Sequence, residues 1–136
     1  EEKDDTFGTF VYKTTSKKYI IIGSYSTLST EYRFIDADKP NDEFRVFQIR
    51  ERDLEYSISH FEDHFYVLTN KDKAKNFKLM KTPVDRTEKE NWVDVIKHRD
   101  DTLLEDITIF KDYLVLEERN NGLNKIKIQK WDGSHA

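Results

Sequence analysis

The sequence has no cysteine, and its 136 residues include only four glycines, two prolines and one methionine. Without cysteine, a disulfide-stapled scaffold is excluded. No apolar run is longer than four residues, whereas a membrane-spanning helix needs roughly 20. The sequence therefore predicts neither a disulfide-rich domain nor a membrane protein, and we expect no membrane partner.

Charge of either sign is not in large excess. Lysine and arginine number 23 against 27 aspartates and glutamates, which leaves a net charge of −4. Such a balance produces no field that would gather nucleic acid, so we expect no nucleic-acid partner. Although the mean hydropathy is −0.85, leucine, isoleucine, valine and phenylalanine supply about a quarter of the chain, above the roughly 20% typical of disordered sequences. We therefore expect one folded domain.

The ends of the chain carry little information on targeting. The first residue is Glu1, the only methionine is Met80, and no charged segment followed by an apolar one is typical of a secretory signal. We expect these residues to be a piece of a longer protein. The absence of cysteine is compatible with a cytoplasmic location, which is our expectation.

Three dense apolar runs recur along the chain at nearly constant spacing. They occupy residues 19–22, 65–68 and 113–116, each begins with an aromatic residue, and their starts are 46 and 48 residues apart. Each run lies between shorter segments in which apolar and polar residues alternate, and alternation predicts strands. The expected strands are residues 10–14, 19–22, 31–35, 44–49, 56–60, 65–68, 76–81, 92–96, 106–110, 113–116 and 123–130.

One connection between expected strands has a specific signature. Residues 120–122 read Asn-Asn-Gly, and an Asn-Gly pair tolerates the positive φ angles of a type I′ turn. The segment therefore predicts a tight hairpin.

The second strand of each repeat is apolar at consecutive positions, so both of its faces need to be covered and sheets must stack on both sides. Four antiparallel strands repeated every 46 to 48 residues predict β-propeller blades, whose periods run about 40 to 50 residues. The fold class that we expect is all-β, a partial β-propeller of between two and three consecutive four-stranded blades. The expected blades are residues 7–50, 51–97 and 101–136, with the last truncated. A lipocalin-like barrel or a β-sandwich is the structural alternative.

Motifs for catalysis are missing from the sequence. A serine hydrolase elbow needs Gly-x-Ser-x-Gly, and a phosphate-binding loop needs several close glycines before a helix, but no two glycines lie four residues apart. Zinc could be held only by histidines together with carboxylates; the histidines are His60, His64, His98 and His135. The first two flank an expected hairpin turn, so we interpret the histidines as solvated turn residues.

Three groups of charged residues have some features of known types of site. The acidic loop at residues 36–42 has Pro40 at a ligand position, and Phe47 stands where calcium would require a glutamate. Lysines around Phe77 are typical of a charged loop entering a strand; they are Lys71, Lys73, Lys75 and Lys78. Carboxylates at expected strand entrances have no partner motif for acid–base chemistry; they are Glu55, Glu105 and Asp106. We therefore assign no catalytic, cofactor-binding or metal-binding residue, and we expect no cofactor.

Eight stretches of the chain carry a family resemblance, and they lie at residues 11–19, 24–37, 55–60, 65–70, 76–79, 90–92, 104–106 and 116–123. In this order they resemble the propeller of the prolyl oligopeptidase family of serine peptidases, in particular its oligopeptidase B (protease II) branch. The resemblance covers nearly the whole chain. It is a resemblance of blade sequence and includes no catalytic motif.

The resemblance implies that the parent is a serine oligopeptidase that cleaves short peptides after lysine or arginine. In that family a C-terminal α/β-hydrolase domain carries the catalytic serine, aspartate and histidine, and a seven-bladed propeller caps it and excludes folded proteins. This chain would be a noncatalytic, substrate-gating part of the lid, with residues 9–14, 56–60 and 106–110 lining the tunnel. Its partners would be that hydrolase domain and short peptides. A β-repeat interaction scaffold with no enzymatic role is the alternative.

An incomplete ring of blades has a physical consequence. Fewer than three complete blades cannot close a ring, so two blade faces and a strand edge would be bare. Exposed apolar faces and open edges favour association. We therefore expect the chain to self-associate through exposed blade faces.

Overall fold

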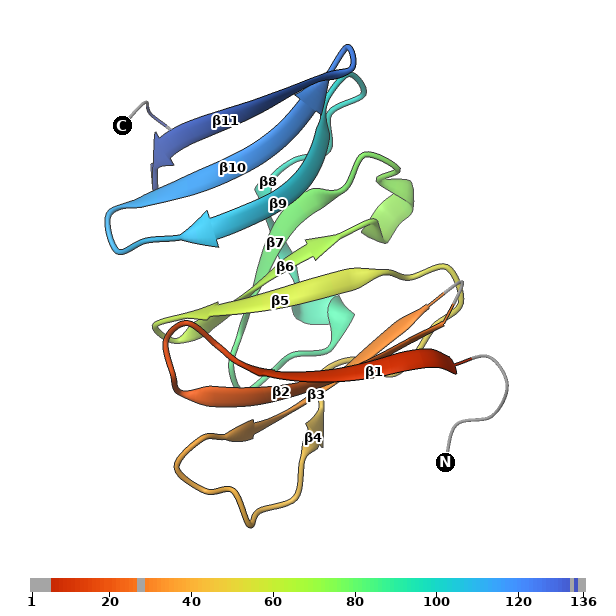
Figure 1. Cartoon of the computed structure of the whole chain (residues 1–136), viewed down its shortest axis with the longest axis vertical. Helices are drawn as coiled ribbons and strands as arrows, with labels where there is room; N and C mark the ends of the chain where they lie inside the picture. The colour runs from red at the N-terminus through yellow and green to blue at the C-terminus, as the bar shows by residue number, and fades with distance from the viewer. Residues whose placement is uncertain (1–5, 27–28, 133, 135–136) are drawn as a thin grey trace.

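The computed structural model describes residues 6–26, 29–132 and 134. Within these residues the chain forms eleven β-strands and two short 3-10 helices, η1 (Lys71–Lys73) and η2 (Lys89–Asn91), and no α-helix. The strands make three antiparallel sheets that follow one another along the chain and stack in one pile (Figure 1). The all-β prediction is confirmed. Among the described residues, no helix has the length and apolar character that crossing a bilayer demands.

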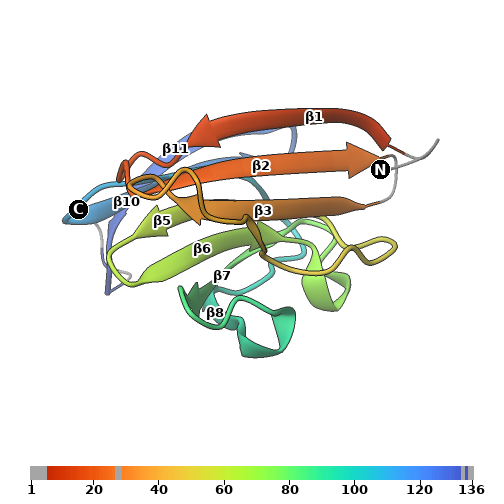
Figure 2. The ribbon, with the colours of Figure 1, turned by 90° about the horizontal axis from the view of Figure 1, so that it is seen from below.

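Each sheet is a meander in which consecutive strands are neighbours, and Figure 2 shows the alternating directions of the first three strands. Sheet 1 contains β1 (Thr6–Lys13), β2 (Tyr19–Ser26), β3 (Thr30–Asp36) and β4 (Arg45–Val46). Sheet 2 contains β5 (Tyr56–Phe61), β6 (His64–Thr69), β7 (Lys78–Pro83) and β8 (Val93–Ile96). Sheet 3 contains β9 (Leu103–Ile109), β10 (Tyr113–Asn120) and β11 (Leu123–Lys130). Two four-stranded sheets and one three-stranded sheet are the arrangement that the sequence predicts.

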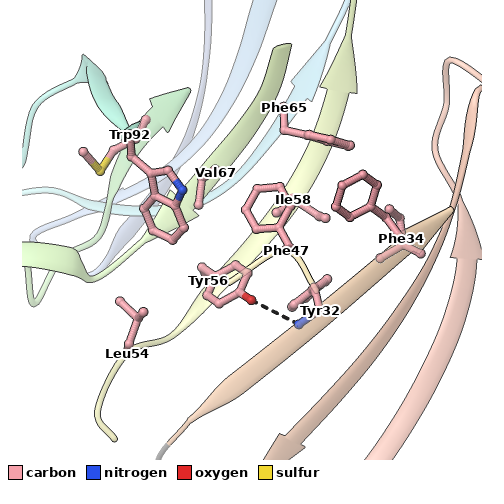
Figure 3. Packing of buried hydrophobic residues seen from close by; sticks show 11 residues of the cluster. Tyr32, Phe34, Phe47, Leu54, Tyr56, Ile58, Phe65, Val67 and Trp92 are labelled. Carbon is pink, nitrogen blue, oxygen red and sulfur yellow. Dashed lines mark hydrogen bonds between the residues drawn. The ribbon is translucent and has the colours of Figure 1, made fainter. Parts of the chain in front are cut away.

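Sheets 1 and 2 enclose an aromatic core (Figure 3). The rings of Phe34, Phe47 and Phe65 meet edge to face, with centroids 5.1 to 6.0 Å apart. The backbone N–H of Tyr32 donates to the Tyr56 hydroxyl at 3.1 Å, which crosses from sheet 1 to sheet 2. Aromatic rings in this geometry contribute packing energy beyond the area that they bury. The contacts of this core fix the two sheets face to face.

The expected fourth strand of sheet 1, at residues 44–49, is much shorter in the structure. Only Arg45 and Val46 pair with β3. Phe47 then turns its ring into the aromatic core, where it is fully buried, and its backbone N–H donates to Tyr32 O at 2.8 Å. The paired strand β4 therefore ends at Val46, and Phe47 belongs to the core.

Sheets 2 and 3 enclose an aliphatic core. Its buried members are Tyr66, Leu68, Leu79, Leu104, Ile107, Leu114 and Leu116. At the edge of this core the ring of Trp131 stacks on Phe61 with centroids 5.1 Å apart. Because β6 is buried on both faces, its apolar run has no alternation, as the sequence analysis expected.

Hairpin ends define which positions of the three sheets are equivalent. The pairs that close the first hairpins are Thr14 with Tyr19, Phe61 with His64, and Phe110 with Tyr113. The aromatic residues at the starts of the three apolar runs are therefore not all equivalent, because Phe65 lies one residue past the position of Tyr19. The sequence alignment of the second repeat is wrong by this one residue.

The corrected register assigns a direction to each sheet face. Ile21 and Tyr66 occupy equivalent positions and each faces the next sheet, while Phe65 and Leu114 are equivalent and each faces the preceding sheet. The sheets therefore stack head to tail. This is the relation that blades of one propeller have to each other.

The hairpin predicted at residues 120–122 is confirmed. Asn120 pairs with Leu123 across a two-residue turn, and Asn121 and Gly122 have φ angles of 53° and 76°. Positive φ at both central residues is the geometry of a type I′ turn.

Candidate functional site

His60 is a buried contact between sheets 1 and 2, so its interpretation as a solvated turn residue is wrong. Its Nδ1 lies 2.7 Å from Ser16 Oγ in the turn of the first hairpin. Its ring contacts those of Tyr19 and Phe65, with centroids 4.7 and 5.4 Å away, and these two rings also contact each other at 5.1 Å. Burial lowers the pKa of His60 below 6.5. The side chain therefore ties two sheets together as a neutral ring.

Of the other histidines, the two that the structure describes each lie beside an aspartate. His64 Nδ1 lies 2.7 Å from Asp63 Oδ1, and the hydrogen bond lowers the pKa of that carboxyl. His98 lies 3.7 Å from Asp100, and His135 is outside the described residues. Across residues 6–26, 29–132 and 134, no three histidine or acidic side chains gather in a way that could hold a metal ion.

The lysine cluster is partly neutralised by its own neighbours. Lys78 is buried, with its Nζ 3.0 Å from Asp94 and 3.2 Å from Asp72. Burial alone would lower the pKa of Lys78, but the hydrogen bonds to the two carboxylates outweigh it and raise the pKa. Lys71 also pairs with Asp72, at 3.1 Å. Lys71 and Lys78 are therefore paired with carboxylates of the adjoining loop and of β8.

In the acidic loop, Arg45 Nη2 lies 3.3 Å from Asp36 Oδ1. An arginine of β4 thus lies beside one carboxylate of the loop, which suits a solvated connection between strands.

Two of the three carboxylates noted in the sequence come together at a cavity of about 420 Å³ between sheets 2 and 3. We call this cavity the inter-sheet cleft; its wall includes Glu55, Ser57, Leu68, Phe77, Leu104 and Glu105. Thr30, at the start of β3, also reaches it. Asp106 is not part of the wall, and its Oδ1 accepts a hydrogen bond from the backbone of Ile107 at 2.8 Å. The sequence identified these carboxylates singly but could not place them together.

Hydrogen bonds hold the backbone of Glu55 in place. Glu55 O accepts hydrogen bonds from Thr69 Oγ1 at 2.7 Å and from Asn70 N at 3.3 Å, and Glu55 N donates to Asn70 Oδ1 at 2.9 Å. Glu105 Oε2 pairs with Arg119 Nη2 at 3.2 Å. Within the described part of the chain, no basic side chain forms an ion pair with Glu55.

The two outermost sheet faces expose apolar side chains. On sheet 1, Val11 is 66% exposed, and it lies opposite the half-buried Ile22. On sheet 3, Ile126 is 74% exposed, and Ile128 lies opposite Val115. The face of sheet 3 is equivalent to the faces that sheets 1 and 2 use to contact the next sheet. Both outer faces therefore have the character of unfilled blade contacts.

Comparison with known proteins gives the same fold. The chain resembles the oligopeptidase B structures of Leishmania major and of Trypanosoma brucei with covalently bound antipain, each with a TM-score of 0.86 and 28% identity. These matches cover 96% and 95% of this chain and 18% of each of those chains.

Two curated relatives are similar over nearly the full chain. Dipeptidyl aminopeptidase BI of Pseudoxanthomonas mexicana is 39% identical over 98% of this chain, and Protease 2 of Moraxella lacunata is 34% identical over 93%. The chain spans only 18% of the length of each relative. A family model, the N-terminal β-propeller domain of prolyl oligopeptidase, matches residues 1–135. The chain therefore belongs to the prolyl oligopeptidase family, as part of its N-terminal β-propeller domain.

Proposed function

We propose that this chain is a noncatalytic, substrate-gating section of the propeller of a longer serine oligopeptidase, one that cleaves short peptides after lysine or arginine. The observation that carries the proposal is the match of nearly the whole chain to the family's propeller. The similarity to Protease 2 and to oligopeptidase B supports it. The catalytic serine, aspartate and histidine would lie in a C-terminal α/β-hydrolase domain outside these residues, and short peptides would be the substrates.

The three sheets would be blades at residues 7–50, 51–97 and 101–136, the last one incomplete. Their first strands, β1, β5 and β9, would line the tunnel through which peptides pass. A direct contact between two of them supports this, because the Tyr12 hydroxyl on β1 donates to Ile58 O on β5 at 2.8 Å. A tunnel lined by adjacent first strands would admit only a peptide that is extended and narrow. We also propose a cytoplasmic location for the parent.

The test compares the full-length protein with this 136-residue chain at equal molarity on short fluorogenic peptides. Peptides ending in arginine or lysine before the fluorophore should be cleaved by the full-length protein and not by the chain. Matched peptides with citrulline in place of arginine are the control for charge, and they should remain intact. A well-folded full-length protein that cleaves none of these peptides would contradict the proposal and would favour an interaction scaffold.

The exposed apolar faces support one further proposal about the isolated chain. We infer that it self-associates, with the outer face of sheet 3 in one copy packing on the outer face of sheet 1 in another. The support is the head-to-tail equivalence of the sheets, because these two faces are the same kinds of face that meet inside the chain. Such a contact is heterologous and extends from copy to copy rather than closing as a two-fold dimer.

A further inference from the structure

The inter-sheet cleft has an apolar floor. Leu68 and Leu104 are buried members of the aliphatic core that also line the cleft, and the half-buried Phe77 adds an aromatic side. A side chain that covers such a floor gains by removing apolar surface from water. The floor therefore suits an alkyl chain rather than a small polar ligand.

Charge at the cleft is negative. Glu105 has one cation, Arg119, within ion-pair distance, and the Glu55 carboxylate has none among the residues that the structure describes. Ser57 and Thr30 add neutral polar groups to the wall. A ligand with an alkyl stem and a cationic end would place the stem on Leu68 and Leu104 and bring the cation to Glu55.

An exposed aromatic surface adjoins the cleft on sheet 1. Tyr25 pairs in the sheet with Thr30, which lines the cleft. Phe10 and Tyr25 have ring centroids 6.2 Å apart and are 37% and 44% exposed. Each ring lies over a glycine of the neighbouring strand: a Cβ added to Gly23 would come within 2.3 Å of Phe10, and one added to Gly8 within 2.6 Å of Tyr25. The missing side chains of these two glycines leave room for the ends of the rings, and the exposed parts of the rings can contact a guanidinium group.

We propose that the inter-sheet cleft binds a basic side chain of an extended peptide, with the alkyl stem on Leu68 and Leu104 and the cationic group at Glu55. The neighbouring residues of the peptide lie over Phe10 and Tyr25. The inference depends on the proposed function only in taking the ligand to be a peptide. It adds a place where the propeller itself selects basic peptides before they reach any catalytic group.

The first experiment measures binding to this chain by nuclear magnetic resonance, at a concentration where sedimentation shows one species. The probe is N-acetyl-arginine amide, and N-acetyl-citrulline amide is its neutral match. Arginine should give saturable shifts of the Leu68 and Leu104 methyl signals, and citrulline should not. Glu55→Gln should weaken arginine binding about fivefold, the size of one partly exposed ion pair. Glu43→Gln changes an exposed carboxylate in the loop between β3 and β4, which does not line the cleft; it is the matched control and should change nothing.

Equal shifts with arginine and citrulline, or an unchanged affinity in Glu55→Gln, would overturn the proposal. A second measurement uses the full-length protein. There, Glu55→Gln should raise about fivefold the KM of a peptide that carries an additional arginine distant from the cleaved bond. The KM of a dipeptide substrate should not change. A different outcome is that arginine binds to this chain as expected while the full-length protein cleaves no peptide. That result would uphold this site and refute the proposed function, so the two failures are distinguishable.

Discussion

Ser16 Oγ and His60 Nδ1 lie 2.7 Å apart, although 44 residues separate them in the chain. The contact joins the turn of the first hairpin of sheet 1 to the end of β5 in sheet 2. Because the His60 ring also packs against Tyr19 and Phe65, protonation would place a charge in an aromatic cluster. The stability of the stack therefore depends on the protonation of this one ring.

The first prediction concerns pH. Burial lowers the pKa of His60 in the folded chain, and the nearby Lys18 acts in the same direction, while the Glu62 backbone and Asp63 oppose it. The unfolded chain therefore takes up a proton at a higher pH than the folded chain, and stability is lost as pH falls through about 6.5. The loss stops below the folded pKa. Urea midpoints measured between pH 8 and 5 should show this decline, and His60→Gln should flatten it.

His64 supplies the control for this measurement. It is paired with Asp63 at the surface of the turn. His64→Gln should therefore preserve most of the pH dependence of the urea midpoint that the unsubstituted chain shows. A decline that persists in His60→Gln would assign the effect to another group.

The second prediction concerns the aromatic core. Phe47 is fully buried among Phe34, Phe65 and Trp92, and Phe47→Ala should lower the free energy of unfolding by about 3 to 5 kcal/mol. Val46→Ala, at the neighbouring and partly exposed position, should cost less than about 1 kcal/mol. Urea unfolding followed by tryptophan fluorescence measures both. Equal losses at the two positions would contradict the assignment of Phe47 to the core.

The third prediction concerns the close contact of Phe10 with Gly23. Gly23→Ala should displace the Phe10 ring and lose its edge contact with Tyr32, at a cost of about 1 kcal/mol. In a chain that already carries Phe10→Ala, the methyl group added by Gly23→Ala has no ring to displace. Gly23→Ala should therefore cost less stability in that background than in the unsubstituted chain. A double-mutant cycle measures this coupling. Strict additivity would show that the two residues do not interact.

The fourth prediction concerns association. Sedimentation at tens of micromolar should show species larger than a monomer. Ile128→Lys on the outer face of sheet 3 and Val11→Lys on the outer face of sheet 1 should each shift the chain toward monomer. Lys127→Gln, on the opposite face of β11 from Ile128, should leave association unchanged. If the unsubstituted 136-residue chain were monomeric, self-association would be refuted.

The sequence predicted the strands and the hairpin at residues 120–122 well, because alternation and an Asn-Gly pair are local signals. It aligned the second repeat wrongly because β6 is apolar on both faces, so the run has no alternation that would reveal its register. The shortness of β4 was also not predictable, since Phe47 lies in a core that forms only where sheets 1 and 2 meet. In these cases stacking between sheets decided the outcome.

The inter-sheet cleft was beyond sequence reasoning for a related reason. Glu55 directly precedes β5 and Glu105 lies within β9, and nothing local to either one indicates that they share a cavity. They meet because β5 and β9 begin at the same end of adjacent sheets. The same is true of His60, whose contacts come from Ser16 and Tyr19 in another sheet.

In β6, residues that are adjacent in the chain belong to different cores: Val67 packs toward sheet 1 and Leu68 toward sheet 3. A displacement of this strand therefore changes the packing volume on both of its sides at once. The two cores cannot melt independently, and the three sheets should behave as one cooperative unit. Methyl groups of these two neighbours thus provide paired local probes whose unfolding transitions should coincide.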